Sequence, residues 1–170
     1  MYNFDTHELG RTDDAVAIET RDENRSASIR MARQSKKTIE IISRELDPII
    51  YDDQEFLDAV KDMILSDYHS RIRIIVLNPQ IITQHSRRLI TLAMSLTSFI
   101  DIRKPGPEYS GFNESLFIAD GCGYIHRKKS DRYEGNLNFN DLRTCKYLLE
   151  SFNEMWNKAV PDENFRKLNI

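Results

Sequence analysis

The segment Asn113-Glu114-Ser115-Leu116-Phe117-Ile118-Ala119-Asp120, followed by Gly121, sets an amide, a hydroxyl and a carboxylate at fixed spacing before a turn. Asn113 cannot act as a nucleophile, because its amide nitrogen lone pair is delocalised into the carbonyl, and it has no pKa suited to proton transfer near pH 7. Ser115 attacks only if an adjacent base takes its proton, and the sequence shows none. Such groups can hold a phosphate, a sugar or a peptide without reacting with it. Alternatively they only cap loops.

Further polar and cationic residues extend this list of candidates. Asn136 and Asn138 add neutral hydrogen-bonding groups, and the candidate anion-binding residues are Arg87, Arg88, Arg127 and Lys128. Residues 71–132 carry 10 Lys and Arg against 5 Asp and Glu. Clustered cations attract phosphate, but a solvated surface balanced by the acidic residues of 1–70 is the favoured explanation. The pI of 5.8 and the 9% aromatic content count against a dedicated nucleic-acid binder.

Several classes of protein find no support in the sequence. Cys122 and Cys145 form neither a disulfide framework nor a zinc site, and the four histidines lack metal-ligand spacing. No glycine-rich phosphate loop is present, so we expect no metal and no cofactor. No apolar run approaches the roughly 18–20 residues of a membrane span. The N-terminus lacks the features of a secretory signal, which predicts a cytoplasmic protein.

Hydrophobic periodicity predicts alternating helices and strands in one domain over 23–170, preceded by an N-terminal arm over 1–22 that packs only in part. We expect strands over 38–43, 72–77 and 99–103, and a hairpin of 115–119 with 123–126 that turns at Asp120-Gly121. Helices are expected over 24–36 and 83–97, and two more are expected to follow the N-cap residues Asp52 and Asp141. A loop is expected over 128–140. Alternation of this kind predicts an α/β fold with a mixed sheet.

The order and spacing of these elements resemble one repeat of the phospholipase D superfamily. That family carries His-x-Lys-x4-Asp, then Gly, at the start of a β-hairpin; Asp120 and Gly121 match, while Asn113 and Ser115 occupy the histidine and lysine positions. Ser43 matches the small polar residue that ends the family's first strand. The sequence from Phe152 to Trp156 matches the Phe-x3-Trp of its last helix. The resemblance covers about residues 24–160. It implies a phospholipase D-like mixed β-sheet flanked by helices on both faces, with a remnant site of Ser43, Asn113, Ser115, Asp120, Asn136 and Asn138.

In active members of the superfamily a histidine attacks phosphorus and lysines stabilise the developing charge. Both residues are replaced here, and the Gly-Ser that often follows the hairpin is missing around 125–128. The resemblance therefore implies a non-catalytic binding or scaffold module. A closer resemblance to bacterial phospholipase D-like domains sometimes attached to N-acetyltransferase-like domains implies an acyltransferase-like partner.

An alternative function stays open. Active one-repeat members of the superfamily pair two copies, so this chain could be a homodimeric phosphodiesterase or nuclease that works through a non-standard site. A homodimer is expected under this alternative and under the binding function.

Overall fold

The computed structural model describes residues 3–84, 87–162 and 165. No helix within these ranges is long and apolar enough to cross a membrane. The elements follow the chain in the order β1 (Val16–Ile18), α1 (Arg21–Gln34), β2 (Thr38–Ser43), α2 (Pro48–Tyr51), α3 (Gln54–Ser66), β3 (Arg71–Val76), η1 (Pro79–Gln84), α4 (Arg87–Ser95), β4 (Ile100–Arg103), η2 (Pro107–Tyr109), β5 (Ser115–Ala119), β6 (Gly123–Arg127), β7 (Gly135–Asn138) and α5 (Leu142–Lys158).

The described strands form one mixed seven-stranded sheet in the order β1-β7-β6-β5-β2-β3-β4. The strands β2, β3 and β4 run parallel, which requires the helical crossovers that α3 and α4 provide. The strand β5 returns antiparallel to β2, and the β5–β6 hairpin then extends the sheet to β7 and β1. The parallel neighbours come from β-α-β units, whereas of the antiparallel pairs only β5–β6 is a tight hairpin.

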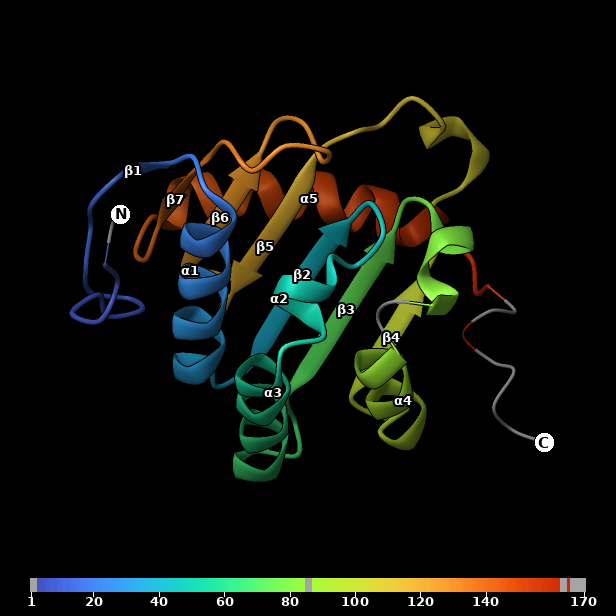
Figure 1. Cartoon of the computed structure of the whole chain (residues 1–170), viewed down its shortest axis with the longest axis horizontal. Helices are drawn as coiled ribbons and strands as arrows, with labels where there is room; N and C mark the ends of the chain where they lie inside the picture. The colour runs from blue at the N-terminus through green and yellow to red at the C-terminus, as the bar shows by residue number, and fades with distance from the viewer. Residues whose placement is uncertain (1–2, 85–86, 163–164, 166–170) are drawn as a thin grey trace.

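Helices cover both faces of the sheet, as Figure 1 shows: α1 to α4 lie on one face and α5 alone lies behind the other. Each face has its own hydrophobic core. The first packs residues such as Ile41 and Phe117 under α1 to α4. The second packs Ile42 and Leu116 under α5. Because neighbouring residues of a strand point to opposite faces, β2 and β5 are buried on both sides and are apolar along most of their length. The predicted fold class is confirmed.

Capping residues mark the helix starts, and α1 begins at Arg21, before the start predicted at residue 24. Thr20 and Glu23 form a capping box at the start of α1, and the side chain of Asp141 accepts the Thr144 N–H at the start of α5. The cap of α3 is Asp53, not Asp52, and its carboxylate accepts from the N–H groups of the next turn. The predicted helix over 83–97 is α4 preceded by η1; the part of that prediction at 85–86 lies outside the described residues.

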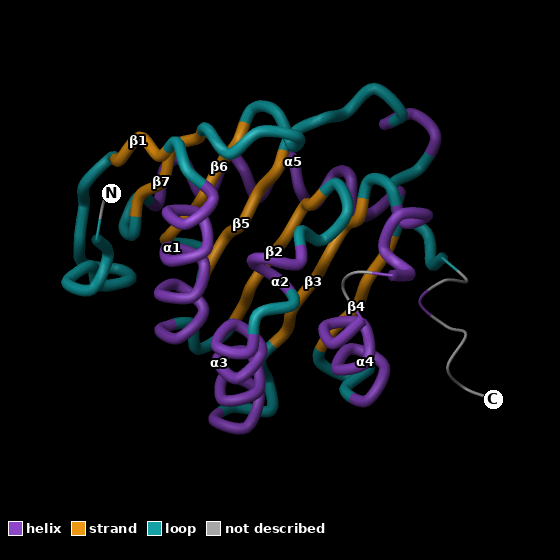
Figure 2. Tube along the Cα trace, in the orientation of Figure 1, coloured by secondary structure: helices purple, strands orange, loops and turns teal. Residues whose placement is uncertain are grey.

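The expected arm and loop contribute more to the sheet than their polar sequences suggested. Residues 16–18 form the edge strand β1, whose partner β7 lies inside the predicted 128–140 loop, and both are visible in Figure 2. Phe4 is fully buried and stacks on Phe139 with ring centroids 6.0 Å apart. These strands have three and four residues, too short for a period of two to stand out in the sequence.

A buried ion pair lies between the sheet and α5. Glu40 of β2 is 2% exposed, and its Oε2 lies 3.5 Å from Nη2 of Arg73 on β3. The Arg73 guanidinium in turn packs over the rings of Phe152 and Trp156, 4.9 and 5.6 Å from their centroids. Oε1 of Glu40 has no hydrogen-bond partner among the described residues. Burial raises the pKa of Glu40 to about 7, although Arg73 opposes the shift.

The raised pKa of Glu40 predicts a dependence of stability on pH. Between pH 4.5 and 7 the folded state holds a proton that the unfolded chain has released, so stability falls as pH rises through this window. The loss at alkaline pH is about 3 kcal/mol at most, since one pKa unit corresponds to about 1.4 kcal/mol. Glu40→Gln removes this contribution. The unfolding free energy of the variant relative to wild type should therefore increase from pH 5 to pH 8 in urea titrations.

The exposed Glu150→Gln on α5 serves as the control, because it changes the same group without a buried partner. A difference between Glu40→Gln and wild type that stays constant from pH 5 to pH 8 would contradict the assignment.

Candidate functional site

The strand register brings three polar side chains together at one end of the sheet. Ile42 pairs with Leu116 and Ser115 pairs with Arg127, so Ser43, Ser115 and Arg127 occupy adjacent positions on β2, β5 and β6. They share the face that α1 to α4 cover, because the preceding row, with Ile42 and Leu116, packs under α5. All three are buried. This row lies at the end of β2 and the start of β5, where the sequence predicted the remnant site.

At the two altered family positions, the side-chain oxygen atoms make internal hydrogen bonds, although Asn113 itself is exposed. Oδ1 of Asn113 accepts the Ser130 hydroxyl at 2.5 Å, and its carbonyl oxygen accepts the Ser130 N–H at 2.8 Å. The Ser115 hydroxyl donates to the carbonyl oxygen of Ile42 at 3.3 Å. The hydroxyl oxygen of Ser43 accepts the Leu46 N–H at 2.9 Å. A backbone carbonyl cannot accept a proton as a general base does, so Ser115 is not activated here.

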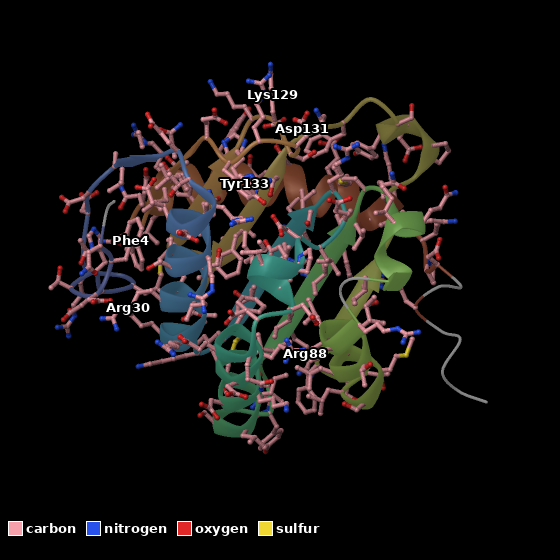
Figure 3. All side chains as sticks on the ribbon, in the orientation of Figure 1. Phe4, Arg30, Arg88, Lys129, Asp131 and Tyr133 are labelled. Atoms are coloured by element: carbon pink, nitrogen blue, oxygen red, sulfur yellow. The ribbon has the colours of Figure 1, made fainter. Side chains whose placement is uncertain are left out.

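The residues 128–134 form a loop over this cluster, with Tyr133 directed into it. The Tyr133 hydroxyl donates to Oδ2 of Asp47 at 2.5 Å, and its carbonyl oxygen accepts Nδ2 of Asn24 at 2.8 Å. The guanidinium carbon of Arg127 lies 5.3 Å from the centre of the Tyr133 ring. Tyr133 is half-buried, and in Figure 3 it lies nearer the middle of the view than the exposed Lys129 and Asp131 of the same loop. The loop thus closes the end of the sheet at which the remnant site lies.

Arg127 places a buried cation beside Ser115. Its side chain donates from Nη2 to the Ser130 carbonyl oxygen at 2.7 Å, while Nε has no partner among the described residues. Burial and the hydrogen bond to Asp47 raise the pKa of Tyr133 to about 12. Burial also raises the pKa of Tyr51 nearby, so both phenols stay protonated at neutral pH. The cluster is therefore a cation, a carboxylate and neutral hydroxyls, which can bind an anion but holds no nucleophile–base pair.

Asp120 does not join this cluster. It lies at the other end of β5, where its carboxylate accepts the backbone N–H groups of Lys36, Lys37 and Thr38 at 2.9, 2.8 and 3.0 Å. Its φ of +52° is tolerated at the turn with Gly121 because Asp visits the left-handed region more readily than most residues. Asp120 is a structural residue that joins the hairpin to the start of β2.

Asn136 and Asn138 also lie apart from Asn113 and Ser115. Both lie on β7 and share the α5 side of the sheet, since they pair with His126 and Tyr124. Asn138 is buried and bonds to Asp13 and to the N–H of Asn140, whereas Asn136 is exposed. The residue before them, Gly135, approaches β6 so closely that a Cβ there would meet the His126 carbonyl oxygen at 2.5 Å. A glycine followed by a small polar residue therefore does follow the hairpin, after the 128–134 loop.

The remaining predicted cations are exposed, with Arg87 and Arg88 on α4 and Lys128 after β6. Arg88 at the start of α4 contacts Asp52 through its side chain and its backbone N–H, the latter bond being 3.1 Å long. Arg87 is exposed beside it, and Lys128 lies on the closing loop. The four candidate anion-binding residues thus do not form one patch.

A pairing that the sequence did not single out lies on the α5 face: Nε2 of His126 is 2.6 Å from Oε1 of Glu114. Neighbouring residues of β6 point to opposite faces, so His126 is separated by the sheet from Ser115 and Arg127.

Comparison with known families decides which family the chain belongs to. The family model described as "Domain of unknown function (DUF7931)" matches residues 20–168. The chain belongs to the DUF7931 family. A search of curated proteins by sequence found no match to this chain.

Solved structures share the fold. Nuc of Salmonella typhimurium, a phospholipase D family member, matches with a TM-score of 0.58 and 12% identity, covering 86% of this chain and 97% of that one. NucT of Helicobacter pylori matches with a TM-score of 0.62 and 13% identity, covering 88% of this chain and 99% of that one. TrmBL2, an archaeal chromatin protein with a novel mode of DNA binding, matches with a TM-score of 0.66 and 14% identity. The match covers 94% of this chain but only 57% of the TrmBL2 chain. The DUF7931 chain therefore has a phospholipase D-like fold, which confirms the resemblance.

The substitution Asp120→Asn tests the anchor at the hairpin turn. Asparagine tolerates the positive φ, so the change leaves the backbone unstrained. It replaces one carboxylate oxygen by an NH2 group, which faces a backbone N–H that it cannot accept. Hydrogen bonds to a charged group contribute about 1.5–3 kcal/mol, and we expect a loss of about 2 kcal/mol in unfolding free energy. Urea unfolding measures it, with the exposed Asp131→Asn as control. Equal stability of the two variants would show that the anchor contributes nothing.

The substitution Tyr133→Phe tests the closure of the remnant site. It keeps the ring over Arg127 and removes only the hydroxyl that donates to Asp47. We expect a loss of about 1–2 kcal/mol in unfolding free energy, because a carboxylate loses a hydrogen bond. The control is Tyr147→Phe on the exposed side of α5, which should lie within about 0.5 kcal/mol of wild type. An unchanged stability of Tyr133→Phe would mean that the loop is held in some other way.

Proposed function

We propose that this DUF7931 domain is a non-catalytic phospholipase D-like module that acts in binding or as a scaffold. The observation that carries the proposal is the state of the two altered positions: Oδ1 of Asn113 accepts the Ser130 hydroxyl, and the Ser115 hydroxyl donates to the Ile42 carbonyl oxygen. A site that performs phosphoryl transfer needs a nucleophile and a proton acceptor in contact with it.

The closing loop supports the same proposal. Tyr133 packs on Arg127 and bonds to Asp47, so the one buried cation of the cluster is covered by the chain itself. A substrate phosphate would have to displace this ring before it reached Arg127. We therefore expect the domain to bind its partners through other surfaces.

The partners of the module are also proposals. The resemblance favours an acyltransferase-like enzyme, and the one-repeat fold favours a homodimer. Nucleic acid is less favoured, because Arg87, Arg127 and Lys128 lie on separate elements and do not line a common groove.

The alternative, a homodimeric phosphodiesterase or nuclease with a non-standard site, has one observation in its favour. The contact of His126 with Glu114 is the arrangement in which a carboxylate orients a histidine for proton transfer. The sheet separates this pair from Ser115 and Arg127, so the two sets of residues cannot act on one substrate together. The binding module therefore stays the first proposal.

Hydrolysis assays separate the two functions. We expect no turnover of bis(p-nitrophenyl) phosphate or of DNA by wild type above the rate of a buffer blank. Activity that Asn113→Ala abolishes would overturn the binding module. Activity that survives Asn113→Ala and disappears in His126→Asn would establish the alternative, and light scattering on the same samples would report whether the active species is a dimer.

A further inference from the structure

Arg127 is a buried cation whose charge is met only in part. It is 7% exposed, and no ion pair between described residues includes it. Its Nη2 donates to the Ser130 carbonyl oxygen at 2.7 Å, while Nε has no hydrogen-bond partner among the described residues. A guanidinium carries five N–H donors and keeps its proton, so burial leaves both charge and donor capacity unused. Because buried charges are normally met by an opposite charge, Arg127 indicates a site for an anion.

The carboxylate of this cluster, Asp47, is engaged by other donors. Its Oδ1 accepts the Ile49 N–H at 3.1 Å at the start of α2, and its Oδ2 accepts the Tyr133 hydroxyl at 2.5 Å. Asp47 and Arg127 form no salt bridge with each other, although both are described. What covers the guanidinium is the ring of Tyr133, labelled in Figure 3, whose centre lies 5.3 Å from the guanidinium carbon. A direct acceptor for Nε is therefore still lacking.

The side chains beside Arg127 are neutral donors. Ser115 lies opposite it across β5 and β6, and Ser43 occupies the adjacent position on β2. The Ser115 hydroxyl makes only a long bond of 3.3 Å to the Ile42 carbonyl oxygen, so it can exchange this acceptor for a better one. Tyr51 is buried, and the charge of Arg127 acts on its phenol, so the two lie within electrostatic range. A cation among hydroxyls is a donor set for an anion with several oxygens.

The closing loop covers Arg127 without belonging to the sheet. No strand or helix includes residues 128–134. Tyr133 is fixed by single hydrogen bonds, from its hydroxyl to Asp47 and from Nδ2 of Asn24 to its carbonyl oxygen. Loops held by few contacts open at a lower free energy than paired strands do. The Tyr133 ring can therefore leave the guanidinium while β6 and β7 stay paired.

We propose that Arg127 binds a tetrahedral oxyanion of the phosphate or sulfate type, and that this binding displaces Tyr133 and opens the closing loop. Two oxygens would accept from Nε and the neighbouring Nη of the planar guanidinium, which binds oxyanions in this bidentate way. The other oxygens would accept from the hydroxyls of Ser115 and Tyr51. Arg127 is not one of the positions of the family's His-x-Lys-x4-Asp motif, so the site is a property of this chain.

The oxyanion acts here as a regulator and not as a substrate, because the cluster holds no nucleophile–base pair. Opening the loop would release Asp47 from Tyr133 and change the surface formed by residues 128–134 and the start of α2. The inference rests on the proposed binding function and adds a ligand that controls the shape of the binding module.

The Nε–H resonance of Arg127 tests the inference on the full, unaltered chain. Sodium phosphate and sodium sulfate are titrated in turn at constant ionic strength, with sodium chloride as the balancing salt. We expect a saturable shift of this resonance with both oxyanions, because Nε gains its first acceptor. The backbone amides of residues 128–134 and of Ile49 should shift with the same midpoint, since the loop and Asp47 part. The Nε–H of the exposed Arg87 serves as the control and should show no saturable shift.

Two variants separate the receptor from the loop that covers it. Tyr133→Phe frees the loop from Asp47, so a larger fraction of molecules is open and the oxyanion should bind about fivefold more tightly. Tyr147→Phe on the exposed side of α5 should leave the affinity within about twofold of wild type. Arg127→Gln should abolish binding, whereas Arg87→Gln should not change it. If Arg127→Gln does not fold, the wild-type titration and the affinity of Tyr133→Phe decide the question.

Three results would overturn the inference: an Arg127 Nε–H resonance that responds to neither oxyanion, an equal response to chloride, or an affinity that Tyr133→Phe leaves unchanged. A short oligonucleotide that shifts this resonance where inorganic phosphate does not would assign the site to nucleic acid and likewise overturn it. Turnover in the hydrolysis assays would instead contradict the non-catalytic function, so failure of the inference and failure of the proposed function are distinguishable.

Discussion

The carboxylate of Asp120 fixes the geometry on which the rest of the molecule depends. It accepts three successive backbone N–H groups at the start of β2 and sits at the tip of the β5–β6 hairpin. A strand slipped by one residue would turn its apolar side chains to the wrong face. By tying the hairpin turn to the start of β2, Asp120 supports the register in which Ser43, Ser115 and Arg127 meet at the far end of the sheet and Ile42 and Leu116 face α5.

Much of this architecture could be predicted from the sequence, because the signals were local. The isoleucine-rich runs of β2 and β3, the Asp-Gly turn and the Asp141 cap each lie within a few residues of the element they specify. The strand over 38–43 matches the structure residue for residue. The phospholipase D-like spacing then supplied the order of the elements in space, which periodicity alone does not determine.

The contents of the candidate site depended on contacts far apart in the sequence. The partner of Tyr133 is Asp47, at a separation of 86 residues, and Asp120 reaches back 84 residues to Lys36. Nothing in the polar stretch 128–140 distinguishes a tyrosine that closes a site from one that lies on a surface. The same limit separated Asn136 and Asn138 from Asn113, since only the register of β7 shows which face they occupy.

The position of Tyr133 also bears on the history of the domain. An ancestor with histidine at position 113 and lysine at position 115 would have needed an open approach to both side chains. In the present chain Asn113 is exposed and bonded to Ser130, whereas Tyr133 packs over Arg127, the buried cation next to Ser115. A lysine at position 115 would set a second cation beside the buried Arg127, with Asp47 as the carboxylate of the cluster. The loop that covers Arg127 therefore also limits the size and charge of the side chain that position 115 can hold.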